Sequence, residues 1–245
     1  MTDTPDIPRP ERHLVEALRE IGSATISGEL RNLGIRNAAI TGPRAFTTGA
    51  VAAGPALTLQ FMPMREDQFG SDEYEDPEKQ LHRHVLYHAR RGDMVVVDAR
   101  GDMDSGIFGE MMLTYFAGLG GEGVVIDGCI RDAAKARTLG VGLWVRGVTP
   151  NFHAQTNIFP FAVNTPIACA NTFVMPGDII VADDDGAVVV PVAMAEQVIE
   201  VGGKHAEWEE FSRERLSQGG DLRKYYPLRA DAETEYLAWK TQGRS

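Results

Sequence analysis

Apolar residues recur at helical spacing near the start of the chain and as short runs through its middle. Between Glu11 and Gly34 they fall three or four positions apart, with a break at Gly22, so this range is predicted to form two helices. The runs that follow indicate buried strands. They lie at Thr47–Leu59, which is rich in Gly, Ala and Val, and at Met94–Asp98, Val124–Asp127 and Leu143–Val148.

Further helices alternate with these strands. The spacing predicts helices over Glu78–Arg91, Gly109–Gly118 and Asp132–Leu139, and a longer one from Val192 to about Leu216. Asp183–Gly186 separates two apolar β-branched runs, Ile179–Ala182 and Ala187–Val190, which is typical of a hairpin. The alternation of strands and helices predicts an α/β fold.

Three parts of the chain differ in composition. Residues 1–10 are polar and rich in proline and are predicted to form a flexible arm, whereas 11–218 should form one domain. Residues 219–245 are a polar C-terminal extension, whose aromatics Tyr225, Tyr226 and Trp239 are expected to pack on a neighbouring subunit. The acidic range Arg65–Lys79 is predicted to be an exposed loop.

Charge and composition exclude several classes of protein. The 245 residues include 24 Lys and Arg against 35 Asp and Glu, for a formal charge of −11, and no basic run opposes this excess, so nucleic-acid binding is not expected. We expect no signal peptide and no membrane span, and therefore a cytoplasmic location. The two cysteines, Cys129 and Cys169, lie in apolar runs and are predicted to be buried thiols.

The densest chemistry lies between Gly106 and Asp132. Glu110 follows Gly109 at a predicted helix start, where free amides favour a carboxylate. Arg131 and Asp132 follow a predicted strand, the usual position of sites in α/β sheets. Arginine holds carboxylates in a fork of two hydrogen bonds, and aspartate oxygens suit Mg²⁺ or Mn²⁺. From residue chemistry alone, a plain ion pair at a helix cap stays an open alternative.

Two other patterns carry less weight. His84 and His88 lie four residues apart, a spacing compatible with metal binding, but no third ligand follows and a solvated or interface helix is favoured. The glycines from Gly118 to Gly123 resemble a phosphate loop, but they precede a strand and no Lys-Ser/Thr follows them, so a nucleotide fold is poorly supported.

A longer motif resembles a known family. Gly109-Glu110, a gap of twenty residues and Arg131-Asp132 match a Gly-Asp/Glu-x20-Arg-Asp signature, and Gly120–Asp132 matches the core around it. Arg146–Pro150 and Pro176–Gly186 match further segments. From about Leu14 to Gly219 the chain resembles the 4-hydroxy-4-methyl-2-oxoglutarate / 4-carboxy-4-hydroxy-2-oxoadipate aldolases, which share their fold with the regulators of ribonuclease E activity, the RraA-like proteins.

The resemblance implies a layered, swivelling β/β/α domain that assembles as a homotrimer or homohexamer. It implies a class II pyruvate aldolase that uses Mg²⁺ or Mn²⁺, cleaves a 4-hydroxy-2-oxo acid and also decarboxylates oxaloacetate. Asp132 would hold the metal, mostly through water, and Arg131 would contact the pyruvyl oxygen and stabilise the enolate.

The same resemblance assigns the remaining site residues. The segment from Gly109 to Met112 would bind the pyruvyl carboxylate, through the amides of Met111 and Met112. Glu110 would be the acidic member of the signature, and Glu209 would complete a neighbouring subunit's site.

Departures from the family pattern leave other functions to consider. Ser27-Gly28-Glu29 stands where the family commonly has Ser-Asp-Ala, which puts the substrate in doubt more than the chemistry. The main alternative is a regulatory protein that binds and inhibits an RNA-processing enzyme, since fold alone does not fix function. A quinone methyltransferase is a third reading, but no strand–GxGxG–helix arrangement near the N-terminus supports it.

Overall fold

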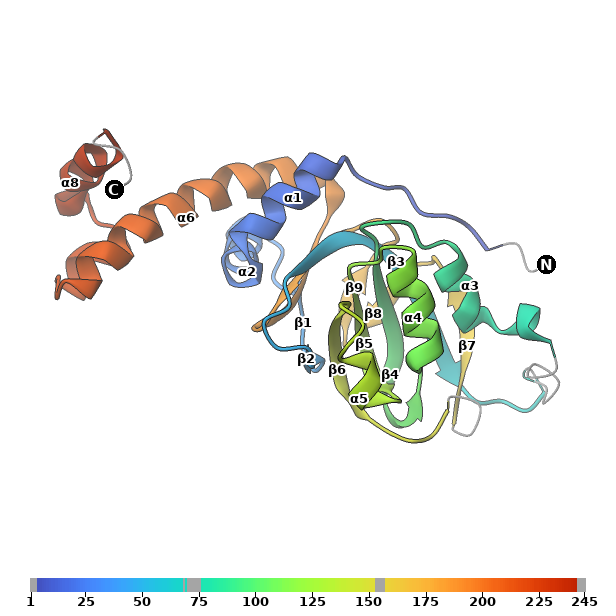
Figure 1. Ribbon diagram of the computed structural model, residues 1–245. Coiled ribbons are helices and arrows are strands. Elements are labelled where there is room, and N and C mark those ends of the chain that lie inside the picture. Colours follow the sequence, from blue (N-terminus) through green and yellow to red (C-terminus); the bar gives the residue numbers. More distant parts are fainter. Residues whose placement is uncertain (1–3, 68, 70–75, 153–156, 242–245) are drawn as a thin grey trace.

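A nine-stranded sheet forms the centre of the computed structural model, which describes residues 4–67, 69, 76–152 and 157–241 (Figure 1). The strands are β1 (Ala39–Ile40), β2 (Arg44–Ala45), β3 (Ala52–Pro63), β4 (Met94–Gly106), β5 (Gly123–Ile130), β6 (Gly142–Val148), β7 (Ile158–Val163), β8 (Ile167–Cys169), β9 (Thr172–Val174), β10 (Ile179–Asp183) and β11 (Gly186–Val190). The sheet order is β1-β11-β10-β3-β4-β5-β6-β2, with β7 also paired to β3, while β8 and β9 form a separate hairpin.

Four neighbouring strands, β3 to β6, run parallel and form the sheet's core. One row of the register joins Leu57, Val95, Val124 and Leu143, and all four side chains are fully buried. Parallel strands are covered on both faces, which explains why their sequences are continuous apolar runs. The other pairings in the sheet are antiparallel, including the β10–β11 hairpin that places Ala182 opposite Ala187.

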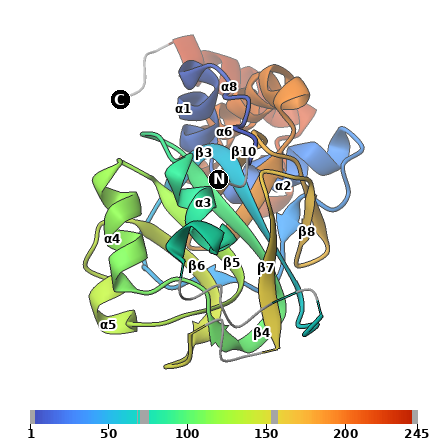
Figure 2. The ribbon, with the colours of Figure 1, turned by 90° about the vertical axis from the view of Figure 1, so that its right-hand side faces the viewer.

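Helices cover the sheet in two groups. The α-helices of the described ranges are α1 (Arg12–Ile21), α2 (Ser23–Asn32), α3 (Leu81–Tyr87), α4 (Glu110–Gly118), α5 (Ala133–Ala136), α6 (Ala195–Ser217), α7 (Leu222–Tyr225) and α8 (Ala230–Thr241). Helices α3, α4 and α5 lie together against the parallel strands (Figure 2), whereas α1, α2 and α6 pack together near β10 and β11. None of the helices in the described ranges is both long and apolar enough to cross a membrane.

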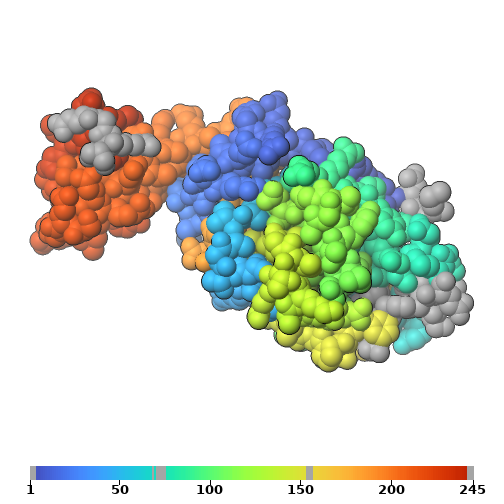
Figure 3. All heavy atoms as spheres, viewed as in Figure 1, coloured from blue at the N-terminus to red at the C-terminus, as the bar shows by residue number. Residues whose placement is uncertain are grey.

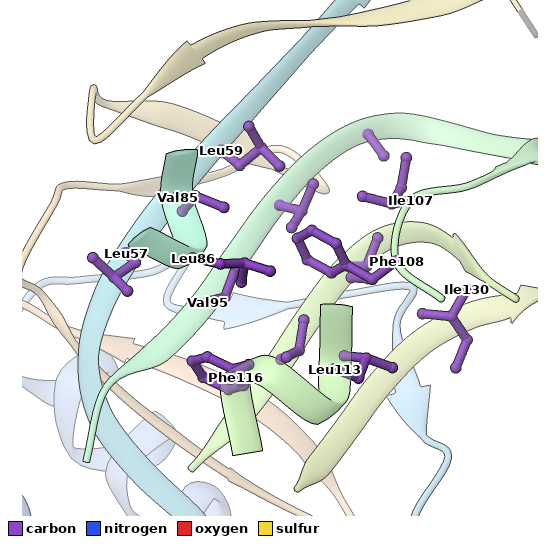
Figure 4. Close-up of a cluster of buried hydrophobic side chains, with 14 of the residues drawn as sticks. Leu57, Leu59, Val85, Leu86, Val95, Ile107, Phe108, Leu113, Phe116 and Ile130 are labelled. Atoms are coloured by element: carbon purple, nitrogen blue, oxygen red, sulfur yellow. The ribbon is translucent and has the colours of Figure 1, made fainter. Parts of the chain in front are cut away.

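The core beneath α3 and α4 fixes the position of α4. Leu113 and Phe116 of α4 lie in one buried cluster with Val95 of β4 and Val85 of α3 (Figure 4). Phe116 is fully buried, so its burial contributes on the order of 1.5–3 kcal/mol to folding. The helix start at Glu110 is therefore held firmly against the sheet.

The C-terminal part of α6 leaves the body of the protein and carries α7 and α8 at its far end (Figures 1 and 3). Phe211 of α6 is fully buried there, with the rings of Tyr225, Tyr236 and Trp239 centred 5.7–5.9 Å away. We refer to residues 207–241 as the C-terminal lobe. Tyr225 and Trp239 therefore contact Phe211 of their own chain, while the expected packing of the tail aromatics on a neighbouring subunit stays a prediction.

Most of the predicted elements are confirmed, and the mixed α/β class with layered sheet and helices is confirmed as well. The first two helices are separated at Gly22, whose φ of 84° stops α1. Several boundaries are wrong: β3 covers Ala52–Pro63 instead of Thr47–Leu59, β4 extends to Gly106 instead of Asp98, and α5 ends at Ala136 instead of Leu139. Helix α3 is shorter than the predicted Glu78–Arg91 because a 3-10 turn, Pro77–Lys79, precedes it. Of the predicted acidic loop, residues 68 and 70–75 lie outside the described residues.

The described part of the N-terminal segment, residues 4–10, is attached to the body. Arg9 donates hydrogen bonds to both carboxylate oxygens of the buried Asp93, at 2.8–3.2 Å, and Ile7 is buried. The division of the chain at residues 10 and 218 stays a prediction. Cys129 and Cys169 are free and buried, as predicted.

Candidate functional site

The end of β5 meets the start of α4. The segment 107–109, between β4 and α4, lies along this end, because Ile107 N–H donates to Cys129 O at 2.9 Å and Arg131 N–H donates to Phe108 O at 3.0 Å. Arg131 and Asp132 come directly after β5. The local backbone therefore brings both members of the Arg-Asp pair against Gly109 and Glu110, although twenty residues separate Glu110 from Arg131 in the chain.

The Asp132 carboxylate caps α4 from outside that helix. Its Oδ2 accepts a hydrogen bond from Glu110 N–H at 3.0 Å and lies 3.7 Å from Nε of Arg131. Asp132 has φ 56° and ψ 36°, the left-handed region, and its side chain makes no capping bond to its own helix α5. The Arg131 and Asp132 side chains are 43% and 44% exposed, so both are open to solvent and to a ligand.

Gly109 permits this close approach. A Cβ at this position would lie 2.6 Å from Oδ2 of Asp132 and 2.7 Å from Nε of Arg131. The Gly109 backbone is extended, with φ −108° and ψ −177°, so the requirement for glycine here comes from space and not from backbone conformation.

The first turn of α4 leaves two amides available. Leu113 N–H is the first to donate within the helix, to Gly109 O at 3.1 Å. Met111 and Met112 precede it, so their N–H groups have no partner inside the helix. The Met111 side chain is 68% exposed, whereas Met112 packs on the core cluster. These amides, next to Arg131, can seat an anion.

Lys135 of α5 belongs to this site, and sequence reasoning missed it. Its Nζ donates to Oε2 of Glu110 at 2.6 Å, and this hydrogen bond is the main reason that the pKa of Lys135 is raised above its usual value. Lys135 lies three residues after Asp132, one turn along the predicted helix, and this spacing was the available signal. The pair neutralises Glu110, so Arg131 retains its attraction for an anion.

The residues present fit a cation held mostly by water. Asp132 offers one exposed carboxylate, and no three His, Cys, Asp or Glu side chains of the described ranges are grouped to enclose a metal. Mg²⁺ keeps several of its waters and is commonly bound through one or two carboxylates. An enclosed site of the zinc type is a poorer fit to this donor set.

Glu209 lies apart from these residues within one chain. It is on α6, which leads away from the end of the body that carries α4 and α5 (Figure 1), and its Oε1 lies 3.3 Å from Nε2 of His205. His205 Nδ1 in turn lies 2.5 Å from a carboxylate oxygen of Glu29. Since the predicted role of Glu209 concerns a neighbouring subunit, it stays a prediction.

His84 lies on α3 and His88 follows its last residue, and neither belongs to a group of three possible metal ligands within the described ranges. His84 is buried and its Nε2 lies 2.8 Å from Glu78 O, while Nε2 of His88 lies 2.7 Å from Oγ1 of Thr4. Each ring has a different partner. The burial of His84 does not fit a solvated helix, and the alternative of an interface helix stays a prediction.

Comparisons with known proteins cover most of the chain. Residues 23–189 match a family described as RraA-like: Aldolase/RraA. A protein of Halalkalibacterium halodurans named "Putative 4-hydroxy-4-methyl-2-oxoglutarate aldolase" is 37% identical over 131 residues, which make up 54% of this chain and 61% of that protein. The match thus spans about three fifths of that relative's length.

Solved structures share the fold. RraAS2 of Streptomyces coelicolor, described as an unusual member of the RNase ES inhibitor RraA protein family, is 43% identical, with a TM-score of 0.76 over 84% of this chain and 98% of that one. An uncharacterized protein of Pseudomonas syringae has a TM-score of 0.78 over 94% of this chain and all of its own, at 22% identity, and supports the fold alone.

Proposed function

The chain belongs to the RraA-like (Aldolase/RraA) family, and on that premise we propose that it is a divalent-metal-dependent class II pyruvate aldolase. It would cleave a 4-hydroxy-2-oxo acid to release pyruvate, with decarboxylation of oxaloacetate as a side activity. The observation that carries the proposal is the meeting of Asp132, Arg131 and the start of α4, where Asp132 Oδ2 lies 3.0 Å from the Glu110 amide and 3.7 Å from Arg131 Nε. The aldolase name of the relative from Halalkalibacterium halodurans supports it.

The site residues divide the work of binding and charge stabilisation in this scheme. The N–H groups of Met111 and Met112 bind the pyruvyl carboxylate at the positive end of α4. Arg131 faces the 2-oxo oxygen and stabilises the negative charge that develops there as the C3–C4 bond breaks. Asp132 would hold Mg²⁺ or Mn²⁺, mostly through water, and the metal would supply Lewis-acid polarisation of the 2-oxo group.

Proton transfer completes the cleavage. The 4-hydroxyl loses its proton to a water held by the acidic groups Asp132 and Glu110, and its oxygen forms a carbonyl with C4, which leaves as the second product. The electron pair of the C3–C4 bond passes to the enolate of pyruvate. A proton then returns to C3 and pyruvate leaves. Lys135 keeps Glu110 in place through the 2.6 Å contact and acts as a positioning residue.

The test is pyruvate release from oxaloacetate and from 4-hydroxy-4-methyl-2-oxoglutarate, with Mg²⁺ and with EDTA. We expect activity only with the metal, and a loss of about 100- to 1000-fold in kcat for Arg131→Met, the range for removing a group that stabilises an oxyanion. Asp132→Asn should weaken Mn²⁺ binding measured by electron paramagnetic resonance. Arg36→Met and Asp185→Asn, which change exposed residues outside the site, are the matched controls. Absence of pyruvate from both substrates would refute the proposal.

Assembly is the second part of the proposal. We propose a trimer or hexamer in which Glu209 of one subunit completes the site of the next. Mixing subunits of inactive Arg131→Met with subunits of inactive Glu209→Gln should then restore part of the activity, because some sites would hold both native residues. Mixed assemblies that stay inactive would assign each site to a single chain.

A second candidate is inhibition of an RNA-processing enzyme. The 43% identity to RraAS2, described as a member of an RNase ES inhibitor family, favours it. Cleavage of a labelled RNA by a purified ribonuclease of the E type should then slow when the protein is added. Equal inhibition by wild type and Arg131→Met would show that this function is independent of the candidate site.

A further inference from the structure

A groove runs between α3 and α4 on the outer side of the helices that cover the sheet. The two helices lie side by side (Figure 2), and the groove encloses about 250 Å³. Six residues line it: Arg83, Leu86, Tyr87, Met111, Met112 and Tyr115. None of them has a role in the chemistry proposed above except the two methionines, which contribute through their backbone amides.

The groove shares Met111 and Met112 with the candidate site. Met111 and Met112 provide the amides proposed to seat the pyruvyl carboxylate, and their side chains form the near wall of the groove. Tyr115 lies four residues beyond Met111, which is about 6 Å along a helix that rises 1.5 Å per residue. A ligand held at the start of α4 therefore has the groove within reach of its distal end.

The lining is apolar and aromatic but exposed. Tyr87 and Tyr115 are each 46% exposed and form an edge-on pair with ring centroids 6.4 Å apart. Together with the exposed Met111 they make a contiguous apolar surface, a feature that marks ligand or protein contacts. Flexible methionine beside rigid tyrosine suits a flat apolar group.

One cation stands in this apolar setting. Arg83 lines the groove and forms no salt bridge with any residue in the described part of the chain. Arg9, Arg19 and Arg146, in contrast, each have a carboxylate partner. A guanidinium beside two aromatic rings is suited to a carboxylate at the end of an apolar ligand.

We infer that this groove is the subsite for the part of the substrate beyond C4, and that it selects an aromatic group that ends in a carboxylate. The inference rests on the proposed function for the identity of the reacting half of the substrate. The volume is sufficient, since a cavity of roughly 150 Å³ accommodates benzene. The substrate class is thus a 4-aryl-4-hydroxy-2-oxo acid, with Tyr87 and Tyr115 against the ring and Arg83 on its carboxylate.

Binding and turnover test different parts of this inference. Three analogues lack the 4-hydroxyl and cannot undergo retro-aldol cleavage: 2-oxobutanoate, 2-oxo-4-phenylbutanoate and 4-(4-carboxyphenyl)-2-oxobutanoate. Isothermal titration in the presence of Mg²⁺ should show Kd falling about tenfold or more at each step of this series, from burial of the ring and then from the charged hydrogen bonds to Arg83.

Variants assign the two steps to residues. Arg83→Met should abolish the gain in affinity that the analogue's carboxylate provides, and Tyr115→Ala should reduce the gain in affinity that its ring provides. Arg36→Met and Phe173→Ala, which change an exposed arginine and an exposed aromatic elsewhere, should preserve both gains. Equal Kd values for the three analogues, undetectable binding of all three, or the same behaviour in Arg83→Met and Arg36→Met would overturn the inference.

Sedimentation and turnover distinguish a substrate subsite from an interface between copies of the chain. If a second copy covers the groove, Tyr115→Ala will change the mass measured by sedimentation and the analogues will not be discriminated, which also overturns the inference. Pyruvate release is measured separately with the corresponding 4-hydroxy compounds. Discriminating binding without any turnover would refute the proposed function and leave the subsite in place.

Discussion

Replacement of Gly109 by alanine should separate the stability of the protein from its activity. The added Cβ would lie 2.6 Å from Asp132 Oδ2 and 2.7 Å from Arg131 Nε, closer than atoms can approach without a shift. Both atoms belong to exposed side chains, which can move away more easily than backbone. The fold is therefore expected to survive while the arrangement of the Arg-Asp pair is lost.

The cost in stability should be small. Moving Asp132 breaks its hydrogen bond to Glu110 N–H and removes the cap of α4, a loss of about 1 kcal/mol. For a protein of this size that corresponds to a decrease of about 2–4 °C in Tm. The displaced Arg131 and Asp132 should cost far more in rate, since a misplacement of about 1 Å lowers activity on the order of 100-fold.

Thermal unfolding followed by circular dichroism and a coupled lactate dehydrogenase assay for pyruvate measure the two quantities. Gly118→Ala is the matched control, because it lies at the other end of α4 and a Cβ there would meet no atom within 4 Å. Gly118→Ala should retain full activity. A Gly109→Ala protein that keeps the wild-type kcat/KM would show that the close contact around Asp132 does not matter for the reaction.

Three other perturbations test the fold around the site. Burial raises the pKa of Asp98 above its ordinary 3.8, so this carboxyl stabilises the native state less as the pH rises from 3.8 through the folded pKa. The free energy of unfolding of Asp98→Asn, measured in urea, should therefore increase relative to that of the wild type as the pH increases. A constant difference between the two free energies from pH 4 to 8 would contradict this cause. Phe116→Ala should lower the free energy of unfolding by about 3–5 kcal/mol, against little change for the exposed Phe173→Ala, and a loss below about 1 kcal/mol in urea unfolding would rule out a packed core beneath α4. Phe211→Ala should remove hydrogen-exchange protection from α8 while β5 stays protected; loss of protection in both would mean that the C-terminal lobe and the sheet unfold together.

The parallel strands were the part of the fold most accessible to sequence reasoning. Val95, Val96 and Val97 are buried on both faces of the sheet, and a strand in that position has a continuous apolar sequence. Short strands such as β1 and β2, of two residues each, gave no comparable pattern. Their conformation depends on pairing with β11 and β6, which only the tertiary fold provides.

The C-terminal lobe shows a different limit. The aromatics after Gly219 are separated by polar residues at irregular spacing, so the sequence read as a polar tail. Their common partner, Phe211, lies on α6, and the contact depends on the turn that returns α7 and α8 to it. Spacing along the chain carries little information about such a contact.

The sequence singled out residues of the candidate site but did not predict how they are arranged. Residue types and their spacing singled out Glu110, Arg131 and Asp132. The capping of α4 by Asp132 could not be predicted, because it depends on the hydrogen bond from Arg131 N–H to Phe108 O, which joins the end of β5 to the segment before α4. Lys135 was missed because an exposed lysine on a short helix is ordinary until its carboxylate partner is known.

The left-handed backbone of Asp132 constrains how this family can change over time. At φ 56° most side chains are strained, and the residues that tolerate the region are glycine, asparagine and aspartate. A descendant that lacked the proposed metal chemistry and kept the fold for another purpose would therefore be expected to carry Asn or Gly here far more often than Ala or Val. The residue at this position can accordingly serve as a marker in related genomes, separating lineages that kept the carboxylate proposed to hold the metal from those that retained only the turn.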